Sequence, residues 1–234
     1  MLAEKAVGPT SNAGQALYRK HILVTAGPTH EPIHPVRVLA NRSSGKQGFA
    51  IAVALAALGA RVTLVAGPVA LPTPTGVTRV DVETALQMQA AVQAALPAHA
   101  AVMVAAVADW RVEASPTKLT KSAGGPPDLR FVENPDLLAE LASSPARPEL
   151  LVGFAAETDN VLANATAKRA RKGCDWIVAN DVSGDVMGGE ANQVILVTSK
   201  GAETWERAPK AEIARRLAAR IASELGESHA EEPV

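Results

Sequence analysis

Residues 21–66, HILVTAGPTHEPIHPVRVLANRSSGKQGFAIAVALAALGARVTLVA, contain the pattern from which the architecture of the whole chain can be inferred. The segment opens with an apolar run at residues 21–25, which predicts a buried strand that ends at Ala26-Gly27-Pro28. Residues 46–58 are mostly apolar and stop at Gly59, so they predict a helix, and residues 61–66 predict a second strand. Strand, helix and strand in this order predict one unit of a parallel sheet.

The same alternation continues outward from this segment. Further helices are expected at residues 82–96, 135–142, 160–172 and 208–225, and further strands at 101–107, 150–154 and 175–179. Residues 193–198 and 203–205 predict an antiparallel finish. The whole pattern predicts an α/β fold: a Rossmann-like, doubly wound, mostly parallel sheet with helices on both faces and a short antiparallel C-terminal extension.

The two ends of the chain lack this periodicity. We expect a flexible N-terminal segment at residues 1–20, one folded domain at residues 21–226, and a flexible acidic tail at residues 227–234.

Composition excludes several classes of function. The chain has 234 residues with 23 Lys and Arg against 24 Asp and Glu, so no global positive field attracts nucleic acid, and aromatic residues are only 3%. No segment is apolar for long enough to span a membrane or to act as a signal peptide. Cys174 is the single cysteine, which excludes an internal disulfide. We therefore expect a cytoplasmic enzyme that binds neither nucleic acid nor membrane.

Two connections, residues 27–45 and 108–128, are too long to be simple connectors, and both follow the carboxyl end of a strand, where such sheets bind ligands. The first contains His30-Glu31-Pro32-Ile33-His34, which matches the pattern of zinc proteases. That chemistry needs a helix, and the prolines at 28, 32 and 35 prevent one. We expect a rigid loop here instead of a zinc site.

The run Asn41-Arg42-Ser43-Ser44-Gly45-Lys46-Gln47-Gly48 is similar to a phosphate-binding loop before a helix. It is no P-loop of the Walker type, because Ala40 and Gln47 stand where that motif needs Gly and Ser or Thr. The dinucleotide fingerprint is missing too, since Pro28 replaces a required glycine. An NAD(P)-dependent oxidoreductase remains an alternative because of the layer order, and a catalytically silent nucleotide-binding partner module is another.

Six ordered motifs resemble the phosphopantothenoylcysteine synthetase family, the ligase of coenzyme A biosynthesis that is often fused to a flavin-dependent decarboxylase. They are VTAGPT (24–29), PVR (35–37) with NRSSGKQG (41–48), AAVADWR (105–111), ENPD (133–136), GFAAET (153–158) and ANDV (179–182). The resemblance implies CTP-dependent condensation of 4′-phosphopantothenate with L-cysteine through an acyl-cytidylate, with Mg²⁺ as the cation. It also implies a homodimer and a decarboxylase domain or partner.

The resemblance further implies roles for individual residues. Arg37, Asn41 and Lys118 match the family's catalytic residues, and Arg37 and Asn41 also match its substrate contacts. The residues that match nucleotide contacts are Ala105, Asp109, Lys118, Pro135, Asp136, Leu137, Leu138, Phe154, Lys168 and Lys172. The chemistry agrees, because lysines can hold a triphosphate and Phe154 can pack against a nucleoside. Metal ligands cannot be assigned from the sequence, although Asp109 is a candidate.

Overall fold

An eight-stranded sheet forms the centre of the computed structural model, which describes residues 15–120, 127–181 and 189–227. Its strands follow one another in the order β12-β11-β10-β9-β6-β1-β4-β5. In chain order they are β1 (His21–Ala26), β4 (Arg61–Ala66), β5 (Val77–Asp81), β6 (Ala100–Met103), β9 (Leu150–Glu157), β10 (Trp176–Asp181), β11 (Ala191–Thr198) and β12 (Gly201–Pro209). The six neighbouring strands β10, β9, β6, β1, β4 and β5 are parallel. The strands β11 and β12 run antiparallel to their neighbours. This confirms the predicted fold class.

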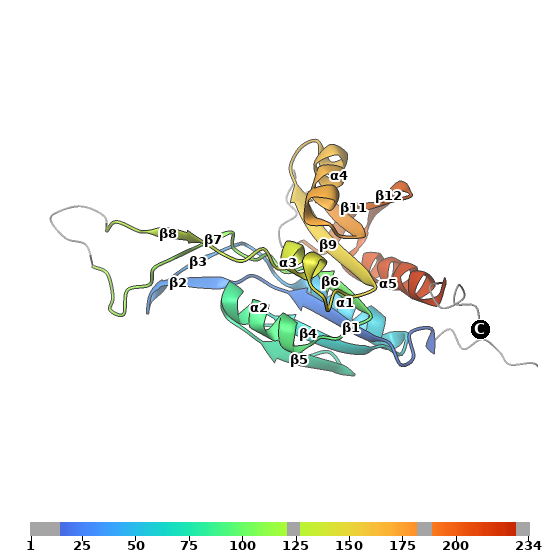
Figure 1. Cartoon of the computed structure of the whole chain (residues 1–234), viewed down its shortest axis with the longest axis horizontal. Helices are drawn as coiled ribbons and strands as arrows, with labels where there is room; N and C mark the ends of the chain where they lie inside the picture. The colour runs from blue at the N-terminus through green and yellow to red at the C-terminus, as the bar shows by residue number, and fades with distance from the viewer. Residues whose placement is uncertain (1–14, 121–126, 182–188, 228–234) are drawn as a thin grey trace, which may run out of the picture.

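Helices cover both faces of the sheet (Figure 1). The helices α1 (Lys46–Ala57) and α5 (Lys210–Glu227) pack on one face, and α2 (Ala85–Ala94), α3 (Leu137–Ser143) and α4 (Val161–Lys172) pack on the other. Successive side chains of a strand point to opposite faces, so Ile22 and Val24 of β1 join the first core and Leu23 joins the second. A strand buried on both faces is typically apolar, and in β1 only His21 and Thr25 are polar.

The described residues of the two long connections, together with residues 129–133, form a two-ribbon arm that extends away from the sheet (Figure 1). The first ribbon pairs β2 (His30–His34) with β3 (Arg37–Ala40), and the second pairs β7 (Trp110–Val112) with β8 (Phe131–Glu133). The amide of Ser115 donates to the carbonyl of Ile33 across the ribbons at 2.9 Å. The expected rigid loop at residues 30–34 is a strand instead, because proline is tolerated in a strand that forms a ladder with only one partner, here β3.

Within the sequence that matches the zinc-protease pattern, Glu31 has a structural role. Glu31 is only 1% exposed, and its Oε1 accepts a hydrogen bond from the amide of Ala85 at 2.9 Å. This carboxylate therefore caps the start of α2, where a negative charge is favourable.

The structure differs from the sequence-based expectations in three places. The strand expected at 101–107 ends at Met103, because residues beyond it leave the ladder with β9, although the amide of Ala106 still donates to the carbonyl of Gly27. The edge strand β5 was not predicted, since its side chains are mostly exposed and lack an apolar pattern. Leu17, in the segment expected to be flexible, is fully buried in the first core.

The folded part therefore begins ahead of residue 21. Residues 1–14 and 228–234, on which the other expected flexible ends fall, lie outside the described residues. Among the residues that the structure describes, no helix is both long and apolar enough to cross a membrane.

Candidate active site

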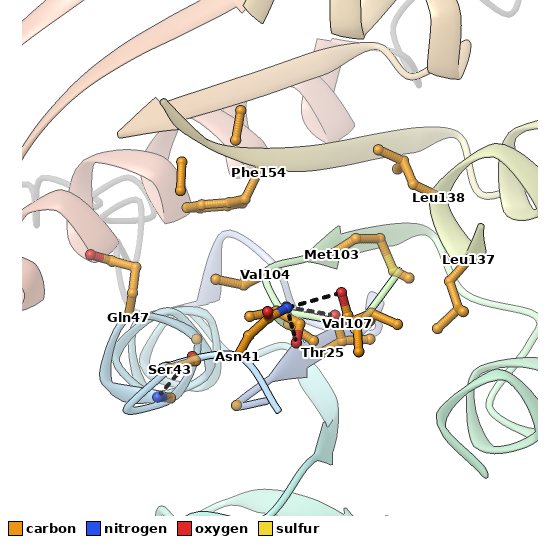
Figure 2. Close-up of a pocket in the computed structure, with 18 of the residues that line it drawn as sticks. Thr25, Asn41, Ser43, Gln47, Met103, Val104, Val107, Leu137, Leu138 and Phe154 are labelled. Atoms are coloured by element: carbon orange, nitrogen blue, oxygen red, sulfur yellow. Dashed lines mark hydrogen bonds between the residues drawn. The ribbon is translucent and has the colours of Figure 1, made fainter. Parts of the chain in front are cut away.

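A pocket of about 650 Å³ opens where β1, β6 and β9 end. Its wall is built from the loop before α1, the segment after β6, the start of α3, the end of β9 and one side of α4. Figure 2 shows Asn41, Gln47, Val104 and Phe154 around this space. The pocket therefore lies at the carboxyl ends of parallel strands, as expected for this class of sheet.

The loop of residues 41–48 forms one wall of the pocket and leads into α1. Gly45 has a φ of 72° and precedes a helix with no side-chain cap and no acidic residue in its first turn. A side-chain Cβ at Gly48 would lie 2.5 Å from Cβ of Ala26, so glycine is needed for α1 to pack closely on β1. The uncapped amides at the start of α1 therefore face the pocket, where they favour an anion.

Asn41 connects this loop to the segment that follows β6. Its amide nitrogen donates to the carbonyl oxygens of Ala106 at 3.3 Å and Val107 at 3.2 Å. Figure 2 shows Asn41 directed at this segment. Both bonds are long, so one can be exchanged for a bond to a ligand at modest cost.

Asp109 is exposed at the pocket, and its loop is fixed through the backbone. The amide of Asn134 donates to the carbonyl of Asp109 at 2.9 Å, and its side chain donates to the carbonyl of Ala108 at 2.8 Å. On the inner side, the amide of Ala108 donates to Oγ1 of the fully buried Thr29 at 3.0 Å. The carboxylate of Asp109 is thus presented by a rigid backbone.

Two lysines from one face of α4 lie on the opposite wall. Nζ of Lys168 donates to the carbonyl of Phe154 at 2.9 Å, and burial lowers the pKa of this lysine. Nζ of Lys172 forms an ion pair with Asp136, whose carboxylate also accepts from the amide of Ala139 at 3.2 Å. Burial acts to raise the pKa of Asp136, but the hydrogen bonds and charge of Lys172 and the helix amide outweigh it and lower this pKa.

The structure brings most of the predicted site residues to this pocket. Those that line it are Asn41, Ala105, Asp109, Pro135, Asp136, Leu137, Leu138, Phe154, Lys168 and Lys172. Arg37 and Lys118 do not line it. Arg37 is exposed on β3, and Lys118 is exposed in the segment after β7, so both belong to the arm.

Two polar lining residues, Asn192 and Lys210, lie outside the motifs quoted above, and two more, Gln47 and Asn180, lie within those motifs but were given no role. Gln47 donates from Nε2 to the carbonyl of Lys210 at 3.2 Å and accepts at Oε1 from Asn192, also at 3.2 Å. Oδ1 of Asn180 is buried without a hydrogen-bond partner among the described residues. No local motif marks Asn192 or Lys210, because folding brings them to Gln47 from distant positions in the chain.

Comparison with known proteins places this geometry in a family. The family model described as "DNA/pantothenate metabolism flavoprotein C-terminal domain" matches residues 17–225. The coenzyme A biosynthesis bifunctional protein CoaBC of Escherichia coli K12 is 51% identical over 172 residues, which are 72% of this chain and 42% of that protein. The chain thus spans less than half the length of this curated relative.

Solved structures give the same picture. The crystal structure of the C-terminal domain of a CoaBC protein is 38% identical, with a TM-score of 0.77 over 91% of this chain and 99% of that one. A Cab2 variant in complex with phosphopantothenate-cysteine has a TM-score of 0.75 over 91% of this chain and 89% of that one. Its sequence identity is 17%, so this second likeness concerns the fold.

Proposed function

The chain belongs to the family of the DNA/pantothenate metabolism flavoprotein C-terminal domain, and on this premise we propose that it is the phosphopantothenate–cysteine ligase of coenzyme A biosynthesis. It condenses 4′-phosphopantothenate with L-cysteine and uses CTP as the co-substrate. The observation that carries the proposal is the pocket itself, which joins an uncapped helix N-terminus, two lysines of α4 and an exposed carboxylate around Phe154. These groups suit a nucleoside triphosphate.

The reaction has two halves. In the first, a carboxylate oxygen of 4′-phosphopantothenate attacks the α-phosphorus of CTP and displaces pyrophosphate, which leaves an acyl-cytidylate. In the second, the amine of cysteine attacks the acyl carbon and CMP departs. Lys168 and Lys172 supply positive charge near Phe154, which packs against the nucleoside.

Asn41 is proposed to act in the second half. Negative charge develops on the acyl oxygen as the amine attacks, and a fixed neutral donor stabilises it without giving up a proton. The amide of Asn41 already donates to two carbonyl oxygens through long bonds, so its orientation is set before the substrate arrives. Ala105 offers backbone groups to the base, and Pro135 to Leu138 shape the turn beside it.

Mg²⁺ fits this pocket as an ion held mainly by phosphate oxygens. Among the described residues, no three His, Cys, Asp or Glu side chains gather into a metal site. Mg²⁺ commonly binds through one or two carboxylates together with substrate phosphates, and Asp109 is an exposed carboxylate at the pocket that can contribute. When bound, the ion neutralises charge on the triphosphate and on the departing pyrophosphate.

Arg37 and Lys118 enter the proposal through a homodimer. Both are exposed on the arm, and neither lines the pocket of its own chain. A second copy in which the arm lies over the neighbouring pocket supplies the positive charge that the family resemblance assigns to these residues. The decarboxylase step belongs to a further domain or partner, as the bifunctional name of the relatives suggests.

Ligand-dependent stability and product detection test the proposal together. A ligand that binds only the folded state raises the unfolding temperature, so CTP with Mg²⁺ should stabilise the protein and NADPH should not. Mass spectrometry should then detect phosphopantothenoylcysteine only when CTP, 4′-phosphopantothenate and cysteine are all present. Stabilisation by NADPH alone would favour the oxidoreductase, and stabilisation by CTP without product would favour a silent module.

A further inference from the structure

The pocket has a second positive corner that the proposed roles do not use. Lys46 and Lys210 line it, each as the first residue of a helix, α1 and α5 respectively. Lys46 forms an ion pair with Glu190. Lys210 is only 8% exposed, and within residues 15–120, 127–181 and 189–227 no hydrogen bond or ion pair is formed by its ammonium group.

The backbone around Lys210 is fixed on both sides. Its amide donates to the carbonyl of Glu190 at 2.9 Å, and its carbonyl accepts from Nε2 of Gln47 at 3.2 Å. Asn192 in turn donates to Gln47, so β11, α1 and α5 are joined at this point. The backbone that carries the Lys210 side chain is therefore fixed where it lines the pocket.

Lys210 is only 8% exposed and makes no ion pair among the described residues, so its charge loses part of its hydration without a bonded partner, which is unfavourable. Burial and the neighbouring charge of Lys46 lower the pKa of Lys210, and Glu190 opposes this shift. The uncapped amides of α1 add further positive potential to the same corner. An anion with more than one negative charge would offset the lost hydration of Lys210, its repulsion from Lys46 and the positive potential of the α1 amides.

We propose that Lys210 binds the terminal phosphates of the nucleotide, which leave as pyrophosphate; the assignment rests on the proposed ligase function. The reacting α-phosphate has to lie near Asn41, and the loop from Asn41 leads directly to the start of α1. The phosphates beyond the reacting one are then the groups that reach Lys46 and Lys210. Lys168 and Lys172, on the opposite wall, remain with the nucleoside side of the ligand.

Binding measurements on three nucleotide fragments test the proposal. Lys210→Met removes the charge and keeps an unbranched side chain, and Lys200→Met is the matched control at an exposed position between β11 and β12. With Mg²⁺ present, calorimetry should show that Lys210→Met weakens binding of CTP and of inorganic pyrophosphate about ten-fold or more. CMP, which lacks the terminal phosphates, should bind as to the unaltered protein. Lys210→Arg should retain most of the affinity for CTP.

Other outcomes would overturn the assignment. Equal losses for CTP and CMP would mean that Lys210 acts on the whole pocket, and weaker binding of 4′-phosphopantothenate alone would give the corner to that substrate's phosphate. Unchanged CTP affinity would leave Lys210 without a binding role. Thermal unfolding checks folding, and if Lys210→Met does not fold, Lys210→Gln is measured in its place.

The two proposals fail in different ways. If the unaltered protein makes no phosphopantothenoylcysteine but Lys210→Met still loses affinity for CTP over CMP, the ligase function falls and Lys210 remains a phosphate contact. If the ligase is active and Lys210→Met binds CTP normally, only the inference about Lys210 falls.

Discussion

At the scale of single residues, the amide of Asn41 has a structural role in the free protein and a proposed role in the reaction. It holds the loop before α1 against the carbonyls of Ala106 and Val107, and it lines the pocket. A carboxylate at this position cannot donate to those carbonyl oxygens or to an acyl oxygen. The side chain's donor groups, rather than its size, should therefore determine the second half-reaction.

Asn41→Asp should still form the acyl-cytidylate and should slow amide formation by about a hundred-fold, because it removes one donor to the developing charge. Rapid quenching followed by mass spectrometry would show the intermediate accumulating before cysteine is consumed. Asn164→Asp, the same change at an exposed position on α4, is the control and should react normally. Normal product formation by Asn41→Asp would show that its role is wrongly assigned.

Asp136 provides a pH-dependent prediction. Its pKa in the folded protein lies below the ordinary value of 3.8, so its contribution to stability is present above that value and is lost as the pH falls through the folded-state pKa. Asp136→Asn keeps a capping residue and removes the ion pair with Lys172. The variant should be less stable at pH 7 by roughly 0.5 kcal/mol, because 44% of the carboxylate side chain is exposed and screened by solvent.

Thermal unfolding from pH 7 to pH 3 would measure this difference, which should shrink below about pH 4. Lys172→Gln removes the ion-pair partner of Asp136. In that background, the stability difference caused by Asp136→Asn should depend little on pH. A stability difference that persists undiminished at pH 3 would exclude the ion pair as its cause.

The candidate site could be predicted from the sequence where its residues belong to a local motif. Asp109 follows a buried apolar run, and Lys168 and Lys172 share one helix face, so their proximity to a strand end could be expected. Lys210 could not be found in this way, because it meets Gln47 across 163 residues of chain. Arg37 and Lys118 lie in the expected connections, but nothing in the sequence indicates that both connections extend away from the pocket.

At the scale of elements, the contact between α1 and β1 positions the uncapped amides at which we propose that an anion binds. Gly48→Ala should lower the free energy of unfolding by about 1–3 kcal/mol, because the new Cβ would lie 2.5 Å from Cβ of Ala26. Gly226→Ala in α5 meets no heavy atom within 4 Å and should instead stabilise the protein by roughly 0.5 kcal/mol. Urea unfolding of both variants makes the comparison.

Equal effects of the two substitutions would mean that α1 does not depend on this close approach. A Gly48→Ala protein that folds should also bind CTP less tightly, since the start of α1 must move away from β1 to accommodate the methyl group.

The elements that could be predicted from the sequence are those buried on a helix-covered sheet. β1, β4 and β10 are largely apolar, so their pattern is unambiguous. The strands β3 and β8 and the edge strand β5 are mostly exposed, and the buried residues of β2, Glu31 and His34, are polar. The pairing of these strands by backbone hydrogen bonds therefore leaves no apolar pattern in the sequence. This physical difference explains why the sheet was anticipated and the arm was not.

At the scale of the whole molecule, the arm carries apolar side chains that are exposed to solvent in the single chain. Val36 is 68% exposed, Phe131 is 54% exposed and Trp110 is 47% exposed, all on the two ribbons. We expect a homodimer that buries part of this surface. Light scattering should give twice the 24.2 kDa mass of the chain, and Phe131→Glu should shift the protein towards monomer.

Leu162→Glu, at a site 48% exposed on α4, is the control and should leave the mass unchanged. A monomeric unaltered protein that is fully active would rule out a role for a second chain in the pocket.

Complementation tests whether Lys118 acts across such a dimer. Lys118→Gln and Asn41→Asp should each be nearly inactive alone, whereas an equal mixture should recover about a quarter of the activity, because mixed dimers contain one site with both groups intact. Steady-state assays of the mixture would measure the recovery. If Lys118→Gln alone releases pyrophosphate normally, Lys118 has no part in nucleotidyl transfer.

The most direct test of the proposed ligase is pyrophosphate release from CTP with Mg²⁺, measured while 4′-phosphopantothenate or cysteine is omitted in turn and with ATP run in parallel. We predict that release requires 4′-phosphopantothenate, that it occurs with CTP, and that phosphopantothenoylcysteine forms only after cysteine is added. Absence of release with either nucleotide, from a protein that still binds CTP, would contradict the ligase and leave a silent nucleotide-binding module.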